Sequence, residues 1–421
     1  MSVPFKSADI LLPDLTKYSG TAWSCVACDQ YTSEPAYWEA ADAIVARAPS
    51  TLRCIIPEVY LAETDARKPA VLAAMDAYLG DVLVEHPHTM ILVERTQRNG
   101  AVRRGLVGMV DLMTYDYQKG ADSLIRATEA TVAERIPART AIRRDAPVEL
   151  PHVMMLIDDR GRTVIEPLAA VKDSLTPAYD YDLMQNSGHL RGYFLTPELV
   201  EQAESALAAL ITPEAMAERY GKEGLAPLLF AVGDGNHSLA AAKTCFEEIR
   251  AALGDEAAMT HPARYALCEV VNLYDDTLHF EPIYRVAFGV DPDRMLDAFE
   301  QYVSTLKGEA SSQRVEWFSG DRSGILTIPT PVVALPVGTV QDFLDGYMAS
   351  APEGAYIDYI HGEETAKALA NRPDAIAFLF DGMAKEELFS TVISDGALPR
   401  KTFSMGHAED KRFYTEVRRI R

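Results

Sequence analysis

The sequence predicts a mixed α/β (α+β) fold, and three observations support that prediction. Short apolar runs, typical of buried strands, alternate along the chain with stretches whose apolar residues recur at helical spacing. Hydrophobic residues make up 48% of the chain and charged residues 24%, which is an ordinary globular composition. With 421 residues, the chain exceeds one ordinary core and suits two or three domains.

The first expected domain covers residues 1–145. Its elements follow from apolar spacing and, for a hairpin, from the turn residues Arg98-Asn99-Gly100 between two strand patterns. Residues 120–151 are rich in arginine and show little strand pattern. The expected elements are helices at 37–47 and 65–79, a short strand at 52–56, and hairpin strands at 90–96 and 101–112.

The second expected domain, 146–290, is built around one strand and one helix. The run Leu228-Leu229-Phe230-Ala231-Val232 is continuously apolar, as in a strand buried on both faces, and it stops at Gly233. An alanine-rich helical pattern follows at 238–253. Further strands are expected at 152–157 and 264–273, and a helix at 197–211. The third expected domain, 291–421, alternates helix and strand patterns at 295–306, 324–328, 340–348, 375–380 and 384–393.

The charge of the chain excludes several classes of partner. A formal net charge of -22 repels phosphate backbones and anionic membranes, so neither a nucleic-acid partner nor membrane docking is expected. No apolar leader or membrane-spanning run is visible, which makes the cytoplasm the expected location.

Five cysteines do not suggest a disulfide framework. Cys25 and Cys28 form a C-x-x-C that is half a zinc site, a redox pair or, as we favour, reduced thiols near a core.

The turn Gly233-Asp234-Gly235-Asn236-His237-Ser238 is the most informative motif. A strand, a glycine turn and a helix together expose backbone N–H groups at a helix N-terminus, which suits a phosphate. Asp234 can hold Mg²⁺ or accept a proton from a substrate hydroxyl, and His237 can donate to a phosphate oxygen. The alternative is an ordinary helix cap made by Asn236 or Ser238.

An arginine-rich stretch stands out against the acidic chain. The forks of Arg126, Arg135 and Arg139 can bind carboxylate or phosphate bidentately. From Arg135 onward the arginines recur every four residues, although Pro137 falls inside such a helix. The alternative is a surface helix whose arginines pair with neighbouring glutamates such as Glu129.

Two further loops carry basic side chains. His189 and Arg191 lie between glycines in residues 186–193, where a loop could close over a ligand or simply lead into a strand. Arg400 and Lys401 stand beside hydroxyl residues in residues 398–406 and could hold a phosphate, although basic loops are common. The sequence lacks the P-loop, the nucleophile-elbow and the H-E-x-x-H motifs, and the glycine turn lacks the third Rossmann glycine.

Five motifs, in order along nearly the whole chain, resemble the bacterial domain-of-unknown-function family 1015 (DUF1015). The central motif of that family is usually Asp-Gly-His-His-Arg followed by a helix, and it is similar to the nucleotide-binding signature of the ParB/sulfiredoxin-like superfamily. The matching motifs here are Ala27-Cys28-Asp29-Gln30-Tyr31-Thr32-Ser33, Ile125-Arg126-Ala127-Thr128-Glu129, Glu149-Leu150-Pro151-His152, Asp234-Gly235-Asn236-His237-Ser238 and Leu398-Pro399-Arg400-Lys401-Thr402-Phe403-Ser404-Met405-Gly406.

The resemblance implies a ParB/sulfiredoxin-like nucleotide-binding core with additional mixed α/β lobes. Relatives in that superfamily include free serine kinases, sulfiredoxin and CTP-binding partition proteins, in which the turn and helix N-terminus hold nucleotide phosphates. Asp234, Gly235, Asn236 and His237 occupy those motif positions here. Ser238 stands where the motif commonly has arginine, so either another arginine, such as Arg126 or Arg135, replaces the missing fork or the ligand binds differently.

These observations lead to one leading hypothesis, a nucleotide-dependent phosphotransferase similar to a free serine kinase that acts on a small hydroxylated metabolite. It expects ATP or ADP and Mg²⁺, with Asp234 as metal ligand and Glu129 as general base. The alternatives are a nucleotide- or anion-binding regulatory protein without turnover and a structural or assembly protein. A homo-oligomer is left open. The expected catalytic residues are Asp234, Glu129 and His237, and the expected phosphate-binding residues are Gly233, Gly235, Asn236, Ser238, Arg126, Arg135, Arg139, His189, Arg191, Arg400 and Lys401.

Overall fold

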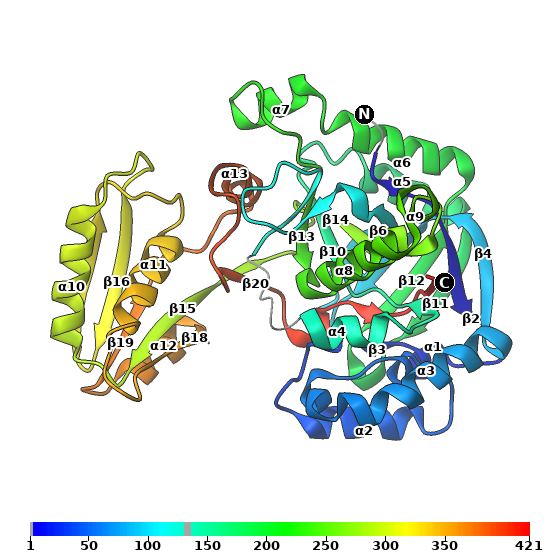
Figure 1. Ribbon diagram of the computed structural model, residues 1–421, viewed down its shortest axis with the longest axis horizontal. Helices are drawn as coiled ribbons and strands as arrows, with labels where there is room; N and C mark the ends of the chain where they lie inside the picture. The colour runs from blue at the N-terminus through cyan, green and yellow to red at the C-terminus, as the bar shows by residue number, and fades with distance from the viewer. Residues whose placement is uncertain (1–2, 130–135) are drawn as a thin grey trace. The chain divides into compact units, whose positions relative to one another are not determined.

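The computed structural model describes residues 3–129 and 136–421, and within them the chain forms two compact units (Figure 1). Unit 1 is Met1–Ala127, Thr131–Leu278 and His407–Arg421, and unit 2 is Thr128–Ala130 and His279–Gly406. Both units combine helices with sheets, which confirms the mixed α/β class. Strands from the expected segments 1–145 and 146–290 share one sheet in unit 1.

The centre of unit 1 is a ten-stranded mixed sheet in the order β11-β12-β5-β6-β14-β10-β13-β8-β7, with β1 paired to β6. The hairpin expected around Gly100 is confirmed as the antiparallel pair β5–β6. At the centre, β10 runs parallel to β14 and antiparallel to β13. The strands are β1 (Phe5–Lys6), β5 (Ile91–Thr96), β6 (Val102–Asp111), β7 (Tyr115–Asp116), β8 (Ile125–Ala127), β10 (Met154–Ile157), β11 (Thr176–Asp182), β12 (His189–Phe194), β13 (Phe230–Asp234) and β14 (Tyr265–Asn272).

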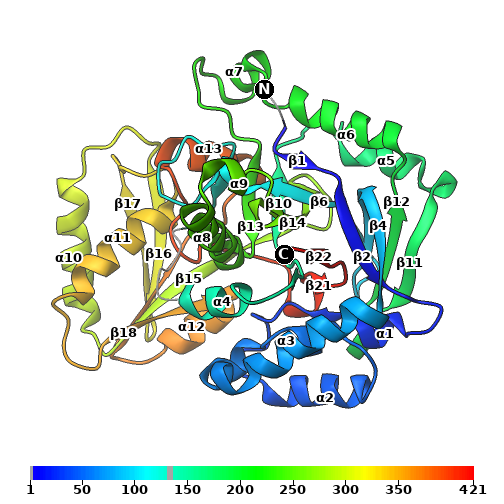
Figure 2. The same cartoon turned by 45° about the vertical axis from the view of Figure 1, so that its right-hand side comes forward.

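The helices of unit 1 pack around this sheet. In both views α2 and α3 lie together, and α5 and α6 lie together at the opposite end of the unit (Figure 1, Figure 2). Among the described residues, no helix combines the length and apolarity needed to cross a bilayer. The helices are α1 (Gly20–Trp23), α2 (Pro35–Val45), α3 (Thr64–Asp81), α4 (Ile136–Arg143), α5 (Ile165–Ala170), α6 (Pro197–Ala209), α7 (Pro213–Tyr220), α8 (Asn236–Leu253) and α9 (Asp255–Ala258).

One local expectation in unit 1 is wrong. The segment expected to be a strand at 52–56 contains the 3-10 helix η1 (Thr51–Cys54), because the Ser50 hydroxyl accepts the N–H of Leu52 and caps a helical turn. This difference arises from a hydrogen bond that apolar spacing does not report. Residues 120–151, where little strand pattern was expected, contain the short strand β8, which pairs in parallel with β13.

The C-terminal residues, His407–Arg421, follow unit 2 in the sequence and belong to unit 1. β21 (Phe413–Tyr414) pairs with β3 (Cys25–Val26), and β22 (Arg418–Arg419) pairs with β9 (Val148–Glu149). A third small sheet joins β2 (Ala8–Pro13) and β4 (Leu83–Thr89). The pairing of β21 with β3 places residues near the end of the chain beside residues close to its start.

Unit 2 is a six-stranded sheet with helices α10, α11, α12 and α13. Phe299 of α10 packs against Phe343 of α11 and Phe378 of β19, with ring centroids 4.7 and 5.8 Å away, so both helices share one face of the sheet. The elements are β15 (Phe280–Phe288), α10 (Pro292–Thr305), β16 (Gln313–Ser319), β17 (Arg322–Ile328), α11 (Pro336–Met348), β18 (Tyr356–His361), α12 (Glu363–Ala370), β19 (Ala375–Leu379), α13 (Lys385–Asp395) and β20 (Phe403–Met405).

Candidate functional site

The turn between β13 and α8 is fixed by one glycine. Gly235 caps the helix with φ +79°, a backbone conformation that favours glycine. A Cβ at Gly235 would lie 2.9 Å from the Cα of Val153, so the turn also packs directly against the chain that enters β10. β13 and α8 are anchored by the fully buried Phe230 and Phe246. The start of α8 is therefore fixed by core residues of β13 before the turn and of α8 after it.

The first turn of α8 follows Gly235 directly. The N–H of Leu239 bonds to the carbonyl of Gly235 at 3.0 Å and closes that turn. Backbone N–H groups point outward at the N-terminus of a helix. Asp234, just before the turn, accepts the N–H of Gly235 at 2.9 Å through Oδ1. The other oxygen, Oδ2, lies 3.5 Å from Nζ of Lys411. Asn236 and His237 are the first two residues of the helix.

Arg139 of α4 brings a guanidinium group to this turn. Its Nη1 donates to Oγ of Ser238 at 2.5 Å, and its Nη2 pairs with Glu58 and lies 4.0 Å from Oδ2 of Asp29. Burial lowers the pKa of Arg139, but Cys28, Asp29 and Glu58 raise it above its ordinary value. Arg139 therefore stays positively charged. It lies beside Ser238, the position at which the family motif commonly has arginine.

His152 forms a second connection to Ser238. Its Nε2 lies 3.2 Å from Oγ of Ser238 and 3.6 Å from Oδ2 of Asp29. Its Nδ1 lies 2.9 Å from the hydroxyl of Tyr414, which accepts the N–H of Cys28 at 3.2 Å. The tautomer of His152 decides which partner donates in these two contacts. The Ser238 oxygen accepts from Arg139 and has His152 as its second polar neighbour.

Asp29 is an ionised carboxylate of this cluster. Burial raises the pKa of its carboxyl, but His152 and Arg139 outweigh burial and hold that pKa well below its usual range. Burial raises the pKa of the neighbouring Cys28 thiol to about 11. Burial likewise raises the pKa of Tyr414 well above its ordinary value, so the phenol keeps its proton. The cluster therefore contains a negatively charged carboxylate beside a thiol and a phenol that keep their protons.

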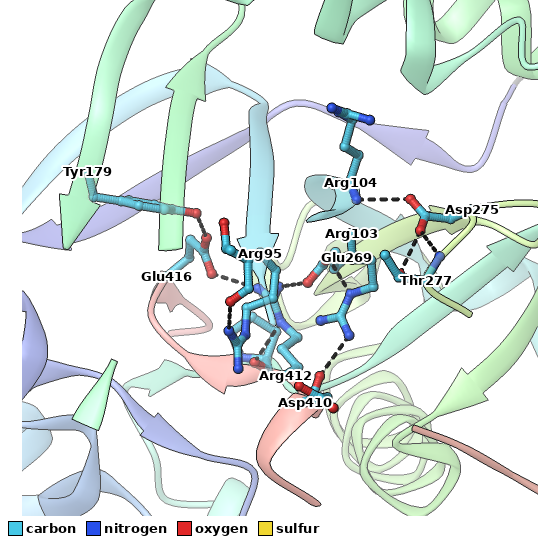
Figure 3. A network of polar contacts seen from close by, with 12 residues as sticks. Arg95, Arg103, Arg104, Tyr179, Glu269, Asp275, Thr277, Asp410, Arg412 and Glu416 are labelled. Carbon is cyan, nitrogen blue, oxygen red and sulfur yellow. Dashed lines mark hydrogen bonds and ion pairs between the residues drawn. The ribbon is translucent and has the colours of Figure 1, made fainter. Parts of the chain in front are cut away.

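Lys411 lies beside Asp234, and a buried network of arginines holds the backbone just before it. Figure 3 shows Arg95, Arg103 and Asp410 of this network. Arg95 donates from Nη2 to the carbonyl of Glu409, and Arg103 donates from Nη1 to the carbonyl of Asp410, both at 2.8 Å. Two guanidinium groups thus fix the backbone immediately before Lys411.

Arg412 anchors the other side of Lys411. Its side chain pairs with Glu269 and with Glu416, and its Nε donates to the carbonyl of Pro151 at 3.2 Å. Tyr179 donates its hydroxyl proton to Glu416, as Figure 3 shows. All these side chains are almost completely buried, so they serve as a rigid support for the segment that carries Lys411.

Three of the residues expected at the turn have other partners. Arg126 is buried in β8 and donates to the carbonyls of Ser123 and Ala226 at 2.9 and 3.1 Å. His189 and Arg191 lie on β12, where both pair with Asp180 of β11. Four strands separate β12 from β13 in the sheet, a distance on the order of 24 Å at ~4.8 Å per strand. The structure therefore does not bring these three side chains to the turn.

The remaining expected residues lie outside unit 1 or outside the described residues. Glu129 belongs to unit 2 and forms a bridge with Leu398. Arg400 also belongs to unit 2, where it donates to Asp345 and Tyr359, and it is followed by Lys401. Arg135 lies outside the described residues. The roles expected for these four residues stay predictions.

Sequence reasoning missed several residues of the cluster. Asp29 and His152 stand in two of the family motifs, which was a usable signal, but neither was selected as a site residue. Glu58, Tyr414 and Lys411 carry no motif, because tertiary contacts alone bring them to the turn. α4 covers Ile136–Arg143 and so includes Pro137 together with Arg139 and Arg143, while Arg135 lies outside the described residues.

The described residues contain no group of three or more His, Cys, Asp or Glu side chains arranged to hold a metal ion. Magnesium takes oxygen ligands, keeps several waters and is commonly held by one or two carboxylates together with substrate phosphates. Asp234 fits the role of such a single carboxylate, although its Oδ2 faces Lys411.

The chain is thus a mixed α/β protein in which Arg139 places a guanidinium group at the first turn of α8. The chain belongs to the family described as "Protein of unknown function (DUF1015)", whose model matches residues 9–375. A search of curated proteins found no match. The family assignment rests on the family model alone.

Among solved structures, the chain is similar to a free serine kinase in complex with AMP, at 12% identity and a TM-score of 0.36, covering 73% of this chain and 90% of that one. SbnI with a C-terminal truncation from Staphylococcus aureus gives 11% identity and a TM-score of 0.33, with coverages of 71% and 82%. A conserved hypothetical protein from Pyrococcus furiosus gives 12% identity and a TM-score of 0.33, with coverages of 73% and 97%.

Proposed function

We propose that the turn at the start of α8 binds the phosphates of a nucleotide and that the protein transfers the terminal phosphoryl group to a small hydroxylated metabolite. The observation that carries this proposal is the 2.5 Å hydrogen bond from Arg139 to Ser238. It supplies a guanidinium fork to a helix N-terminus, and these two features together favour a phosphate. The fork comes from α4, since position 238 itself holds a serine.

The donors around the turn would hold the donor phosphates. Arg139, the Ser238 hydroxyl and the backbone N–H groups at the start of α8 supply hydrogen bonds, and Lys411 supplies a second cation. Mg²⁺, carried by the phosphates and by Asp234, would neutralise charge on the transferred group. Phosphoryl transfer depends mainly on positioning and electrostatic stabilisation, which such a rigid set of donors provides.

Asp29 is the carboxylate of unit 1 that lies beside both Arg139 and His152, and we propose that it takes up the acceptor's proton as that proton is released. The acceptor oxygen forms a bond to the terminal phosphorus, and the bond from that phosphorus to the bridging oxygen breaks. The nucleotide leaves one phosphate shorter, and the hydroxyl proton passes to a carboxylate. Asp29 is ionised and lies near the donors of Arg139 and His152. Glu129 of unit 2, expected from the sequence, is the competing base.

A coupled assay of nucleotide turnover with a panel of small alcohols and hydroxy acids tests the proposal. We expect turnover with ATP or ADP and Mg²⁺, and we expect Arg139→Ala and Asp234→Asn each to lower it about 100-fold, as loss of a charge-stabilising group does elsewhere. Asp29→Asn and Glu129→Gln, measured side by side, identify the base by the larger loss of kcat. Equal background rates of nucleotide turnover in the wild type and in Arg139→Ala, across the whole panel, would contradict phosphotransferase activity.

A thermal-shift measurement, made beside the turnover assay, separates the regulatory alternative. If nucleotide raises the melting temperature but no reaction gives product, the protein binds nucleotide without turnover. No thermal shift with nucleotide, Mg²⁺ or phosphate would contradict both functions and would favour a structural protein.

A further inference from the structure

A cavity of about 150 Å³ in unit 1 opens beside the Ser238 cluster. Its polar end is formed by Glu58, Arg139, His152 and Ser238. The rest of its wall is largely apolar and comes from η1 and the chain after it, from α3, from α4 and from α8. Apolar lining residues include Ile55, Leu61, Met75, Ile142, Leu239 and Ala242.

The two other charged groups of the wall, Arg143 and Glu149, pair with each other. Arg143 donates to Oε2 of Glu149 at 2.5 Å, and Oε1 of Glu149 accepts from Arg418 and from the N–H of Leu267. Burial raises the pKa of Glu149, but Arg418 and Arg143 lower it below its usual value overall. A charged group of a ligand placed beside this pair would compete with it and would lose its own hydration, which disfavours binding. An uncharged, apolar group is favoured instead.

The polar end of the cavity favours a neutral hydroxyl over a further anion. Arg139 stands there between two carboxylates, those of Glu58 and Asp29, and under the proposed function it also contacts the nucleotide phosphates. A hydroxyl group can accept from Ser238 or Arg139 and donate to Glu58 through the same oxygen. A carboxylate head would be repelled by Glu58, and an ammonium head could not accept from Arg139.

We propose that this cavity binds a small alcohol whose hydroxyl lies at the end formed by Ser238 and Arg139 and whose apolar body fills the rest. A cavity of about 150 Å³ lined by apolar side chains takes a group of about the size of benzene, which sets the size of that body. The assignment of this alcohol as the phosphoryl acceptor rests on the proposed function. Binding of the alcohol rests on the cavity alone, and the two are therefore tested separately.

The test compares benzyl alcohol with glycerol, without nucleotide, by isothermal titration and thermal shift on the full chain. We expect benzyl alcohol to bind at least about tenfold more tightly than glycerol, because burial of its ring is worth more than the ~1.4 kcal/mol that a tenfold change represents. Ala242→Leu fills the cavity from α8, and Ile142→Trp fills it from α4. Ala252→Leu adds the same bulk as Ala242→Leu to an exposed position of α8 and serves as the matched control.

Loss of benzyl alcohol binding in either folded cavity variant, with binding kept in Ala252→Leu, supports the proposal. Glycerol binding as tightly as benzyl alcohol, or benzyl alcohol binding unchanged in a folded cavity variant, overturns it. If benzyl alcohol binds but is not phosphorylated when nucleotide is added, the proposal that the cavity binds an alcohol stands. The proposal that this alcohol is the phosphoryl acceptor is then contradicted. Phosphorylation of glycerol in preference to benzyl alcohol overturns this ligand class and leaves the phosphotransferase standing.

Discussion

Arg139 and Ser238, 99 residues apart in the sequence, meet at the first turn of α8 with 2.5 Å between Nη1 and Oγ. This contact gives the turn the guanidinium group that its own sequence lacks. It also joins the turn to Glu58 and Asp29, since the same guanidinium faces both carboxylates. The proposed phosphate site and the proposed acceptor site therefore share one side chain.

Replacing Arg139 tests this shared role. We expect Arg139→Ala to weaken ADP binding about 10- to 100-fold, as loss of a charge-assisted hydrogen bond worth about 1.5–3 kcal/mol predicts. Arg139→Lys should recover only part of the affinity, because an ammonium group cannot form the fork. Isothermal titration measures both. Arg144→Ala, which removes an exposed arginine just after α4, is the control, and equal affinity in Arg139→Ala and this control would contradict the role.

Gly235 carries a packing constraint in addition to its backbone conformation. We expect Gly235→Ala to lower the free energy of unfolding by about 2–4 kcal/mol, from the positive φ and from the contact with Val153. Gly221→Ala has a similar positive φ but meets nothing within 4 Å, so it isolates the backbone cost of about 1–2 kcal/mol. Urea denaturation of both variants measures the difference, and equal losses would show that the close approach to Val153 is unimportant.

Lys411 is expected to contact the phosphates rather than only to neutralise Asp234. We expect Lys411→Ala to weaken the binding of tripolyphosphate, measured by titration without Mg²⁺, about tenfold or more. Adding Asp234→Asn to Lys411→Ala separates the two roles in a double-mutant cycle. Affinity that stays weak in the double variant supports direct contact. Affinity restored to the wild-type value would show that Lys411 acts only through Asp234.

The local part of this site could be predicted from the sequence, and the assembled cluster could not. The end of β13 and the helical pattern of α8 follow from an apolar run, a glycine and an alanine-rich stretch, all adjacent in the chain. The substitute arginine was expected at Arg126 or Arg135, and Arg139 was expected with them among the phosphate-binding residues. The structure places Arg139 at the turn instead, because α4 packs against α8.

The missed residues share a physical cause. Tyr414 and His152 are 262 residues apart and meet only because the C-terminal strand β21 returns to pair with β3. Apolar periodicity describes contacts within one element, and it carries no record of such long-range pairing. Lys411 reaches Asp234 in the same way, since its segment is placed by buried arginines from β5 and β6.

The Cys28 thiol gives a pH-dependent readout of the cavity that it lines. Its pKa is raised by burial to about 11, so the thiolate fraction is small at pH 8 and grows until the pH passes that value. We expect the alkylation rate of Cys28 by iodoacetamide to rise about tenfold per pH unit between pH 8 and pH 10, because only the thiolate reacts. Benzyl alcohol should slow the reaction. Mass spectrometry of the Cys28 peptide measures the rate, and a rate that levels off near pH 8.5 would contradict the raised pKa.

A structure of the full chain with a non-hydrolysable ATP analogue and Mg²⁺ tests the central claim most directly. We predict phosphate oxygens within hydrogen-bonding distance of Arg139, of the Ser238 hydroxyl and of the backbone N–H groups at the start of α8. A nucleotide bound elsewhere, with Arg139 still paired only with Glu58 and Ser238, would contradict the account.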